Sequence, residues 1–255
     1  MTDTPTILEL RDVEKTYENG THAVRGISLA VKKGEIFGIL GPNGAGKTTT
    51  LEMIETLTPI TKGVITLAGF DVARQPDQVK QLIGVQPQAP GFQDKTKLSE
   101  VLELFSAAYG EQADPLPALD EVGLKEKANN LIEELSGGQK QRLSIAVALI
   151  HKPKVLFLDE PPTGLDPQAR RNLWELVRAI RDRGITVIMT THYMDEARSL
   201  CDRIAIMDMG KIIALDTPRN LIQALLDRGF KKEQHVQQAD LEDVFLDLTG
   251  KELRE

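Results

Sequence analysis

The sequence predicts an α/β fold in which a mostly parallel sheet carries helices on its faces. In the second half of the chain, apolar segments of strand length alternate with segments whose apolar residues recur at helical spacing. This order is typical of parallel strands that are joined by helical crossovers. The run 36–40 is apolar and ends at a glycine-rich loop, as expected for a strand that is buried on both faces.

The first third of the chain is predicted to be rich in strands. A strand is expected at 7–17, and another at 23–31, where apolar and polar residues roughly alternate. The strand 36–40 follows, and 63–69 is a further strand bounded by turn residues. A helix is expected from about residue 47 to residue 57, directly after the glycine-rich loop.

The stretch 89–150 is predicted to be a helical subdomain inserted between two halves of the sheet. Apolar residues fall at helical spacing over 98–108. Pro115 and Pro117 mark a loop, and a short helix is expected near 119–124. The remaining elements are expected as a helix at 138–150, a strand at 155–158, a helix at 168–181, a strand at 185–190, a helix at 194–200, and a hairpin over 204–214 that turns at Met209–Gly210.

The end of the chain is predicted to form a helical extension over 219–255. Residues 224–238 are polar and are expected to be loosely structured. After them comes an amphipathic stripe formed by Leu241, Val244, Phe245 and Leu248.

Composition limits the classes of function. The 255 residues carry a net charge of −7 and no strongly basic tract, so no nucleic-acid partner is expected. Cys201 is the only cysteine, which excludes an intrachain disulfide. We expect no secretory signal at the N-terminus, and no run approaches the length of a membrane span. If the protein works at a membrane, another polypeptide must supply the spans.

Residues 41–48 fit the phosphate-binding loop pattern G-x-x-x-x-G-K-[ST] at every fixed position. The loop follows a buried strand and opens a helix, so its backbone N–H groups and the positive end of the helix can converge on phosphate oxygens. Lys47 is expected to reach the β- and γ-phosphates, and the Thr48 hydroxyl to bind Mg²⁺. The expected nucleotide contacts are Gly41, Pro42, Asn43, Gly44, Ala45, Gly46, Lys47, Thr48 and Thr49.

Two further motifs stand downstream. The apolar strand 155–158 ends in Asp159 and Glu160. Asp159 is expected to hold the Mg²⁺ shell, while Glu160 points elsewhere and can orient or deprotonate an attacking water. Residues 135–139 read Leu-Ser-Gly-Gly-Gln; they offer either a second set of N–H donors at a helix start or simply a helix with a serine N-cap.

Taken together, these motifs resemble the nucleotide-binding subunit of an ATP-binding cassette (ABC) transporter, over residues 6–255. In that family the Leu-Ser-Gly-Gly-Gln motif contacts the ATP that the opposite subunit holds, which implies this role for Ser136, Gly137, Gly138 and Gln139. The resemblance also implies that Tyr17 stacks on adenine and that His192 contacts the γ-phosphate.

The resemblance assigns two more positions. Gln88 matches the glutamine that touches Mg²⁺ and senses the transmembrane partner, with Gln86 as a rival for that role. Asp166 matches the loop that crosses the dimer interface. At Pro162 the family commonly has a polar residue, so this loop departs from the pattern and is expected to be stiffer.

The implied protein is one ABC ATP-binding domain over 1–255. It has a P-loop NTPase core of α/β class with an antiparallel β flank, the inserted helical subdomain 89–150 and the C-terminal extension 219–255. Two copies, or one copy and a similar chain, would bind head to tail around two ATP molecules. A separate transmembrane permease subunit would hold them at the cytoplasmic face of the cell membrane. Catalysis is assigned to Lys47, Glu160 and His192.

Resemblance to prokaryotic drug-resistance and antibiotic-resistance exporters favours export. Import remains one alternative, and a soluble ATPase of the same family that acts outside transport is another. A third is a regulator that binds nucleotide without turnover, which the presence of both Glu160 and His192 disfavours.

Overall fold

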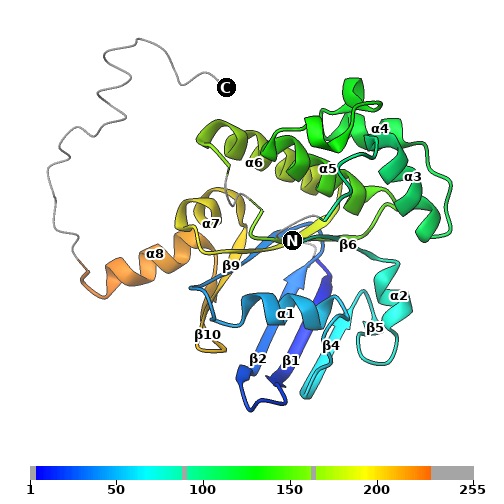
Figure 1. Ribbon diagram of the computed structural model, residues 1–255. Coiled ribbons are helices and arrows are strands. Elements are labelled where there is room, and N and C mark those ends of the chain that lie inside the picture. Colours follow the sequence, from blue (N-terminus) through cyan, green and yellow to red (C-terminus); the bar gives the residue numbers. More distant parts are fainter. Residues whose placement is uncertain (1–3, 88–90, 162–164, 231–255) are drawn as a thin grey trace, which may run out of the picture. The chain divides into compact units, whose positions relative to one another are not determined.

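A six-stranded sheet forms the centre of the protein in the computed structural model, which describes residues 4–87, 91–161 and 165–230 (Figure 1). The strand order is β10-β9-β3-β8-β7-β6. All neighbours are parallel except the hairpin formed by β9 and β10. The strands are β3 (Ile36–Leu40), β6 (Ile83–Gln86), β7 (Val155–Asp159), β8 (Thr186–Thr191), β9 (Arg203–Asp208) and β10 (Lys211–Asp216).

A second, antiparallel sheet confirms the predicted β flank. Its order is β2-β1-β4-β5, and every pair in it is antiparallel. The strands are β1 (Thr6–Thr16), β2 (His22–Lys32), β4 (Lys62–Leu67) and β5 (Phe70–Asp71). The α/β fold class is therefore confirmed, with the predominantly parallel sheet and the antiparallel sheet as separate layers.

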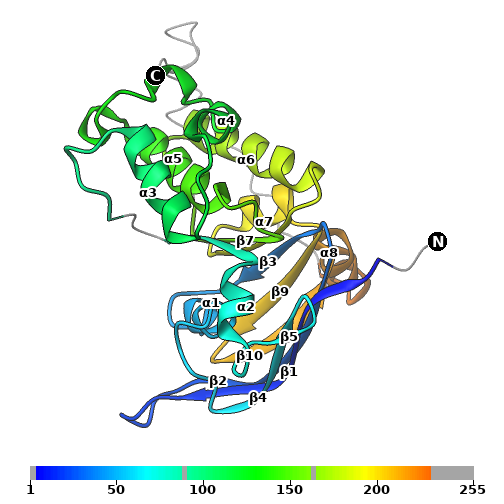
Figure 2. The same ribbon diagram turned by 90° about the vertical axis from the view of Figure 1, so that its right-hand side faces the viewer.

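Helices cover one face of the six-stranded sheet, and the antiparallel sheet lies beyond the other face. Both views place α3 to α6 together on one side, with α1 and β1, β2 and β4 on the opposite side (Figures 1 and 2). The helices are α1 (Lys47–Ile54), α2 (Pro76–Lys80), α3 (Leu98–Ala108), α4 (Pro115–Glu121), α5 (Gly137–Leu149), α6 (Pro167–Asp182), α7 (Met194–Leu200) and α8 (Pro218–Asp227), with 3₁₀ turns at Lys125–Lys127 and Ile132–Glu134.

Strand β3 contributes side chains to the hydrophobic cores on both faces of the six-stranded sheet, because successive side chains on a strand point to opposite faces. Ile36 and Leu40 belong to the core on the side of α3 to α7, whereas Phe37 and Ile39 belong to the core on the side of α1 and the antiparallel sheet. All four side chains are buried. Burying an aliphatic or aromatic side chain of this size stabilises a fold by about 1.5–3 kcal/mol. The position of the loop after β3 is therefore fixed from both sides.

The structure corrects two predictions in the helical region. Pro115 and Pro117 lie in the first turn of α4 and not in a loop. Proline is tolerated there because the first N–H groups of a helix have no intrahelical acceptor, and Asp114 caps this helix by accepting a hydrogen bond from the Leu116 N–H group. Helix α1 ends at Ile54, short of the predicted residue 57, and Thr56 adopts a left-handed φ of 65°.

The C-terminal part is described separately, because the chain divides into units Met1–Leu221 and Ile222–Glu255. Residues 224–227 were expected to be loosely structured but belong to helix α8. The stripe predicted at 241–248 lies outside the described residues. Among the residues that the structure describes, no helix is long and apolar enough to cross a membrane.

Candidate nucleotide-binding site

The phosphate loop connects the central strand β3 with helix α1. Because β3 lies between β8 and β9, the loop leaves the sheet at its middle, beside the ends of the neighbouring strands. Helix α1 begins at Lys47, and no side chain caps its N-terminus at Gly46. The first N–H groups of such a helix remain available to an anion, which the positive end of the helix dipole also attracts.

Close packing against backbone explains two of the glycines. Gly46 has a φ of 102°, and a Cβ atom there would lie 2.5 Å from the carbonyl oxygen of Ala23 on β2. A Cβ atom on Gly41 would lie 2.2 Å from the carbonyl oxygen of Met207 on β9. Any larger residue would force the loop away from these strands.

The turn between β9 and β10 also supports the phosphate loop. The Gly210 N–H group donates to the carbonyl oxygen of Ala45 at 2.9 Å, and the Gly210 carbonyl accepts from the Arg25 N–H group at 2.8 Å. The turn therefore ties the phosphate loop to β2. The hairpin and its turn at Met209–Gly210 were predicted, but this contact was not.

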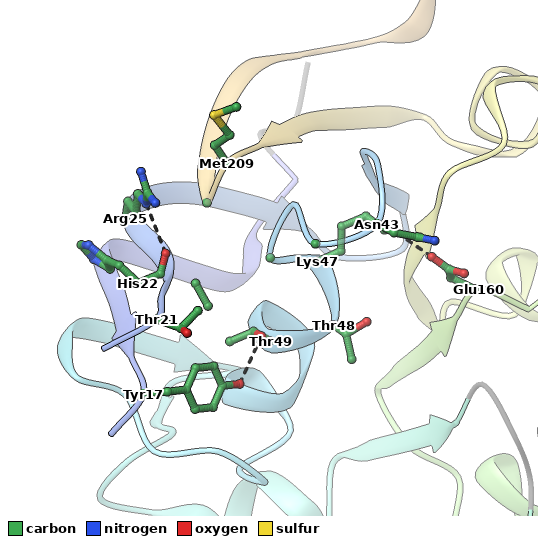
Figure 3. A pocket seen from close by; sticks show the side chains of 14 residues that line it. Tyr17, Thr21, His22, Arg25, Asn43, Lys47, Thr48, Thr49, Glu160 and Met209 are labelled. Carbon is green, nitrogen blue, oxygen red and sulfur yellow. Dashed lines mark hydrogen bonds and ion pairs between the residues drawn. The ribbon is translucent and has the colours of Figure 1, made fainter. Parts of the chain in front are cut away.

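A cavity of about 700 Å³ opens over the phosphate loop (Figure 3). This volume is in the range of sites that bind small molecules and cofactors. The Tyr17 ring lies beside α1, and its hydroxyl is 3.2 Å from the Thr49 hydroxyl. Sequence reasoning missed a further part of the lining, which consists of Thr21, His22, Ala23, Arg25, Met209 and Gly210. These residues come from the β1–β2 region and the β9–β10 turn and carry no motif.

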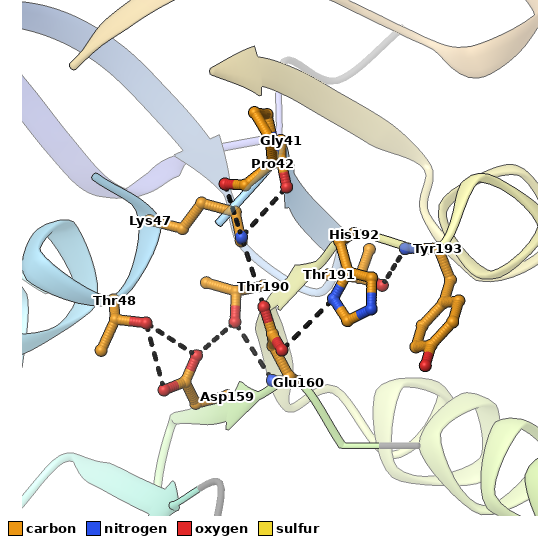
Figure 4. Close-up of polar contacts among 10 residues, drawn as sticks. All are labelled: Gly41, Pro42, Lys47, Thr48, Asp159, Glu160, Thr190, Thr191, His192 and Tyr193. Atoms are coloured by element: carbon orange, nitrogen blue, oxygen red, sulfur yellow. Dashed lines mark hydrogen bonds and ion pairs between the residues drawn. The ribbon is translucent and has the colours of Figure 1, made fainter. Parts of the chain in front are cut away.

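Lys47 lies at the centre of the polar contacts (Figure 4). Its ammonium group donates to the carbonyl oxygens of Gly41 at 3.0 Å and Pro42 at 3.2 Å. It also lies 3.2 Å from Oε1 of Glu160. The Lys47 side chain is only 4% exposed, and a buried ammonium group needs an anionic partner. Glu160 supplies that partner in this structure.

Asp159 and Glu160 are oriented by a threonine that sequence reasoning missed. Asp159 at the end of β7 pairs in register with Thr190 on β8. The Thr190 hydroxyl donates to Oδ1 of Asp159 and accepts from the Glu160 N–H group at 3.1 Å. Glu160 itself has a φ of 47°, which is uncommon for a residue with a side chain. The two consecutive carboxylates therefore point in different directions, Asp159 toward Thr48 and Glu160 toward Lys47, as predicted.

The Glu160 carboxylate also faces His192. Its Oε2 atom lies 3.3 Å from Nδ1 of His192, which follows the end of β8. The imidazole contacts the ring of Tyr193, with 4.1 Å between the ring centres. The structure therefore brings Lys47, Glu160 and His192 together, although they lie far apart in the sequence.

The oxygen atoms opposite Lys47 have the chemistry that Mg²⁺ requires. The Thr48 hydroxyl donates to Oδ2 of Asp159 at 3.4 Å. Mg²⁺ prefers oxygen ligands and is commonly held by one or two carboxylates together with substrate phosphates. The described residues contain no group of three or more His, Cys, Asp or Glu side chains that could hold a metal alone. The hydroxyl of Thr48 and the carboxylate of Asp159 therefore fit a Mg²⁺ ion whose other ligands would include phosphate oxygens of a nucleotide.

The third predicted metal contact, Gln88, lies outside the described residues. Its rival Gln86 is fully buried at the end of β6, and its amide donates to the Pro87 carbonyl oxygen. The choice between them stays a prediction.

The Leu-Ser-Gly-Gly-Gln motif forms a helix cap. The Ser136 hydroxyl accepts from the Gln139 N–H group at 3.4 Å, and the Gln139 side chain accepts from the Ser136 N–H group at 3.0 Å. Gly137 and Gly138 form the first turn of α5. Asp166 similarly caps α6, accepting from the Ala169 N–H group at 2.8 Å. None of these residues lines the cavity over the phosphate loop, so their contact with a nucleotide stays a prediction.

The fold and the phosphate loop define a P-loop nucleotide-binding protein, and sequence comparison identifies the family. The ABC transporter family matches residues 24–163. The chain is 42% identical over 224 residues to the linearmycin resistance ATP-binding protein LnrL of Bacillus subtilis, covering 86% of this chain and 72% of that protein. It is 43% identical over 222 residues to the Nod factor export ATP-binding protein I of Burkholderia orbicola, covering 85% and 73%. The chain belongs to the ABC transporter family and is an ATP-binding cassette.

Solved structures support the same conclusion. CbiO1 from Clostridium perfringens, part of the ABC transporter complex cbiONQ, superposes with a TM-score of 0.79 at 28% identity, covering 89% of this chain and 94% of that one. The dimeric bacterial ABC transporter cassette MJ0796 superposes with a TM-score of 0.75 at 28% identity, covering 84% and 99%.

Proposed function

We propose that the chain hydrolyses ATP to drive an export complex in a cell membrane. The carrying observation is the position of the Glu160 carboxylate, which lies between the Lys47 ammonium group and the His192 imidazole and next to Asp159. A carboxylate so placed can orient or deprotonate a water that attacks a phosphate held by Lys47. The export assignment is supported by the names of two relatives, which concern linearmycin resistance and Nod factor export.

Each element of the site has a proposed role toward ATP. The N–H groups at the start of α1 and the Lys47 ammonium group bind the phosphates, and the Tyr17 ring stacks on the base. The phosphates would compete with Glu160 for Lys47 and so release the carboxylate for its role toward water. His192 contacts the γ-phosphate. Thr48, Asp159 and Gln88 would hold Mg²⁺, which neutralises phosphate charge when it is bound.

Tyr17→Ala is expected to weaken ATP binding about tenfold, because stacking of a base on an aromatic ring contributes roughly 1–3 kcal/mol. Tyr17→Phe keeps the ring and loses only the hydroxyl contact with Thr49, so it is expected to bind ATP within about threefold of the wild type. Equilibrium binding of a fluorescent ATP analogue measures both. Equal losses in the two variants would contradict a stacking role.

We further propose that two cassettes bind head to tail, with residues 136–139 of each facing the phosphate loop of the other. This arrangement would explain why the Leu-Ser-Gly-Gly-Gln cap of α5 does not line the cavity of its own chain. The helical insertion 89–150 and the neighbouring groove would contact a separate permease subunit at the cytoplasmic face of the membrane. ATP binding would close the dimer, and hydrolysis would open it.

The groove for the permease is apolar. It has a volume of about 630 Å³ and is lined by residues from the segment that follows α1, from β6, from the stretch 91–96 and from helices α3 and α5. Leu57 and Leu104 line it and are 67% and 66% exposed. Exposed apolar side chains gathered in one groove are typical of a protein interface. Glu55 also lines this groove, although its side chain is 6% exposed.

Glu55→Gln is expected to change how stability depends on pH. Burial, and secondarily the charges of Asp159 and Glu52, raise the pKa of Glu55 from its usual value to about 7. A raised carboxyl pKa means that the folded state loses stability as pH rises from about 4.5 through 7, by at most about 3 kcal/mol. Relative to the wild type, the Gln variant should therefore gain stability over this interval.

Urea unfolding of the wild type and the variant at pH 5 and pH 8 measures the difference. Glu103→Gln on the exposed face of α3 is the matched control and should follow the wild type. A constant offset between wild type and Glu55→Gln at both pH values would show that Glu55 does not titrate in this interval.

The proposed function is tested by purifying the chain from detergent-solubilised native membranes and identifying its partners by mass spectrometry. A partner with several membrane spans, recovered together with Mg²⁺-dependent ATPase activity, is the expected result. The sequence of that partner would then separate export from import. Recovery with soluble proteins alone would overturn the transport assignment and favour an ATPase that acts outside the membrane.

A further inference from the structure

A buried polar cluster connects His192 with helix α6. Glu196 on α7 is fully buried, and its Oε1 atom accepts a hydrogen bond of 3.3 Å from the Trp174 indole on α6. Its Oε2 atom is also buried and has no hydrogen-bond partner among the residues that the structure describes. A buried carboxylate oxygen without a partner is costly, so its retention calls for an explanation.

A second buried polar atom without a partner among the described residues belongs to Arg170, on the face of α6 that also carries Trp174. Arg170 precedes Trp174 by four residues, which places the two side chains on one face of the helix. Within the described part of the chain, Nε of Arg170 is buried without a hydrogen bond. Its guanidinium carbon lies 5.0 Å from the centre of the Tyr193 ring, a distance typical of a cation–π contact.

The groups that act on the Glu196 carboxylate come from α6, from β8 with the residue after it, and from the end of α7. Burial raises the pKa of Glu196 to about 7, while the nearby Thr191 hydroxyl, the hydrogen bond from Trp174 and the nearby charges of Arg170 and His192 lower it. Burial, and secondarily the charge of Glu196, raise the pKa of the Cys201 thiol, which directly follows α7. Arg170 and His192 therefore both act on this carboxylate electrostatically.

We propose that Glu196 is a positioning residue, which holds the loop between β8 and α7 against α6 and thereby places His192. The proposal rests on the role proposed above for His192 in ATP hydrolysis. A continuous set of contacts carries it, from Glu160 to His192, from His192 to Tyr193, from Tyr193 to Arg170 on α6, and from Trp174 on α6 back to Glu196.

The cluster also connects the proposed dimer interface with His192 in the proposed catalytic site. Helix α6 begins directly after Asp166, which the family resemblance assigns to the loop that crosses the dimer interface. The same helix carries Arg170 and Trp174. A shift of α6 on dimer closure would thus reach His192 through Glu196, and the unpartnered Arg170 and Glu196 atoms leave room for a new ion pair to form.

Kinetics of two Glu196 variants test this proposal. Glu196→Leu should lower kcat for ATP hydrolysis at least tenfold, with KM for ATP within twofold of the wild type, because the phosphate loop and Tyr17 are untouched and only His192 is misplaced. Glu196→Gln still accepts from Trp174 but loses the charge that faces Arg170, so at least a threefold loss is expected. The Gln variant keeps the test open if the Leu variant does not fold.

A double-mutant cycle separates positioning from general structure. In a His192→Ala background, the Glu196 substitutions should have no further effect on kcat, because their influence passes through His192. The same fractional loss in both backgrounds would overturn the proposal. Arg178→Gln is the matched control, since Arg178 also joins α6 to α7 by donating to the Ser199 carbonyl at 2.8 Å. It lies away from His192 and should keep wild-type kcat.

Trp174 gives a readout that does not depend on hydrolysis. It is the only tryptophan in the chain, so its emission reports directly on the contact with Glu196. Addition of Mg²⁺ and ATP should change the emission of the wild type and of Arg178→Gln, but not that of Glu196→Leu. No change in the wild type would overturn the proposal. If His192→Ala retained full activity while emission still responded, the proposed role of His192 would fail and the contact would stand.

Discussion

Glu160→Gln is expected to lower kcat for ATP hydrolysis by at least 100-fold, whereas the Kd for ATP should be unchanged or lower. A positioned general base contributes about 10²–10⁴-fold to a rate, and the amide cannot accept the proton of the attacking water. Binding is spared because the carboxylate competes with phosphate for Lys47, to which it is 3.2 Å distant. Removing its charge removes that competition.

Phosphate release and equilibrium binding of ATP, measured on the same preparation, give the two quantities. Glu175→Gln on the exposed face of α6 is the matched control and should retain wild-type kcat. Undiminished hydrolysis by Glu160→Gln would remove Glu160 from the catalytic role. A parallel loss of binding would assign it to nucleotide affinity.

A mixture of Lys47→Ala chains and Ser136→Ala chains is expected to recover activity that neither variant has alone. If each site combines Lys47 of one copy with Ser136 of the other, a mixed dimer contains one intact site and one site that lacks both residues. Random pairing makes about half of all dimers mixed, so recovery should reach at most about one quarter of wild-type activity if the two sites act independently.

Phosphate release across a series of mixing ratios measures this recovery, which should be largest for equal amounts. Ser136→Ala also removes the N-cap of α5, which costs about 1 kcal/mol of stability. Asp114→Ala removes the comparable cap of α4 and serves as the control, because it should keep full activity. Activity of the mixture at the level of the more active variant alone would contradict a shared site.

Motifs with a fixed spacing could be predicted from the sequence because their chemistry depends on neighbouring residues. The phosphate loop, the carboxylates after β7 and the family itself were identified in this way, and the family and the fold are confirmed. The two faces of β3 explain why the fold could be predicted. Its continuous apolar run is possible only where both faces of a strand are buried.

Contacts made between strands could not be predicted in the same way. Thr190 orients Asp159 and Glu160 only because β7 and β8 pair in one register, and a threonine in a strand has no distinguishing sequence. Pro115 and Pro117 were misassigned because proline interrupts a helix in its interior but is accommodated in its first turn. The pairing of Trp174 with Glu196 likewise depends on how α6 packs against α7.

The turn at Gly210 has a consequence for the order of events during synthesis. A ribosome releases the phosphate loop early, yet the loop leaves a strand that lies between β8 and β9 and is held by the Gly210 N–H group. Non-local contacts of this kind form only when both partners have emerged. A nascent chain that stops before β9 should therefore lack a shaped nucleotide site, so ATP is expected to bind only after nearly the whole first unit has been translated.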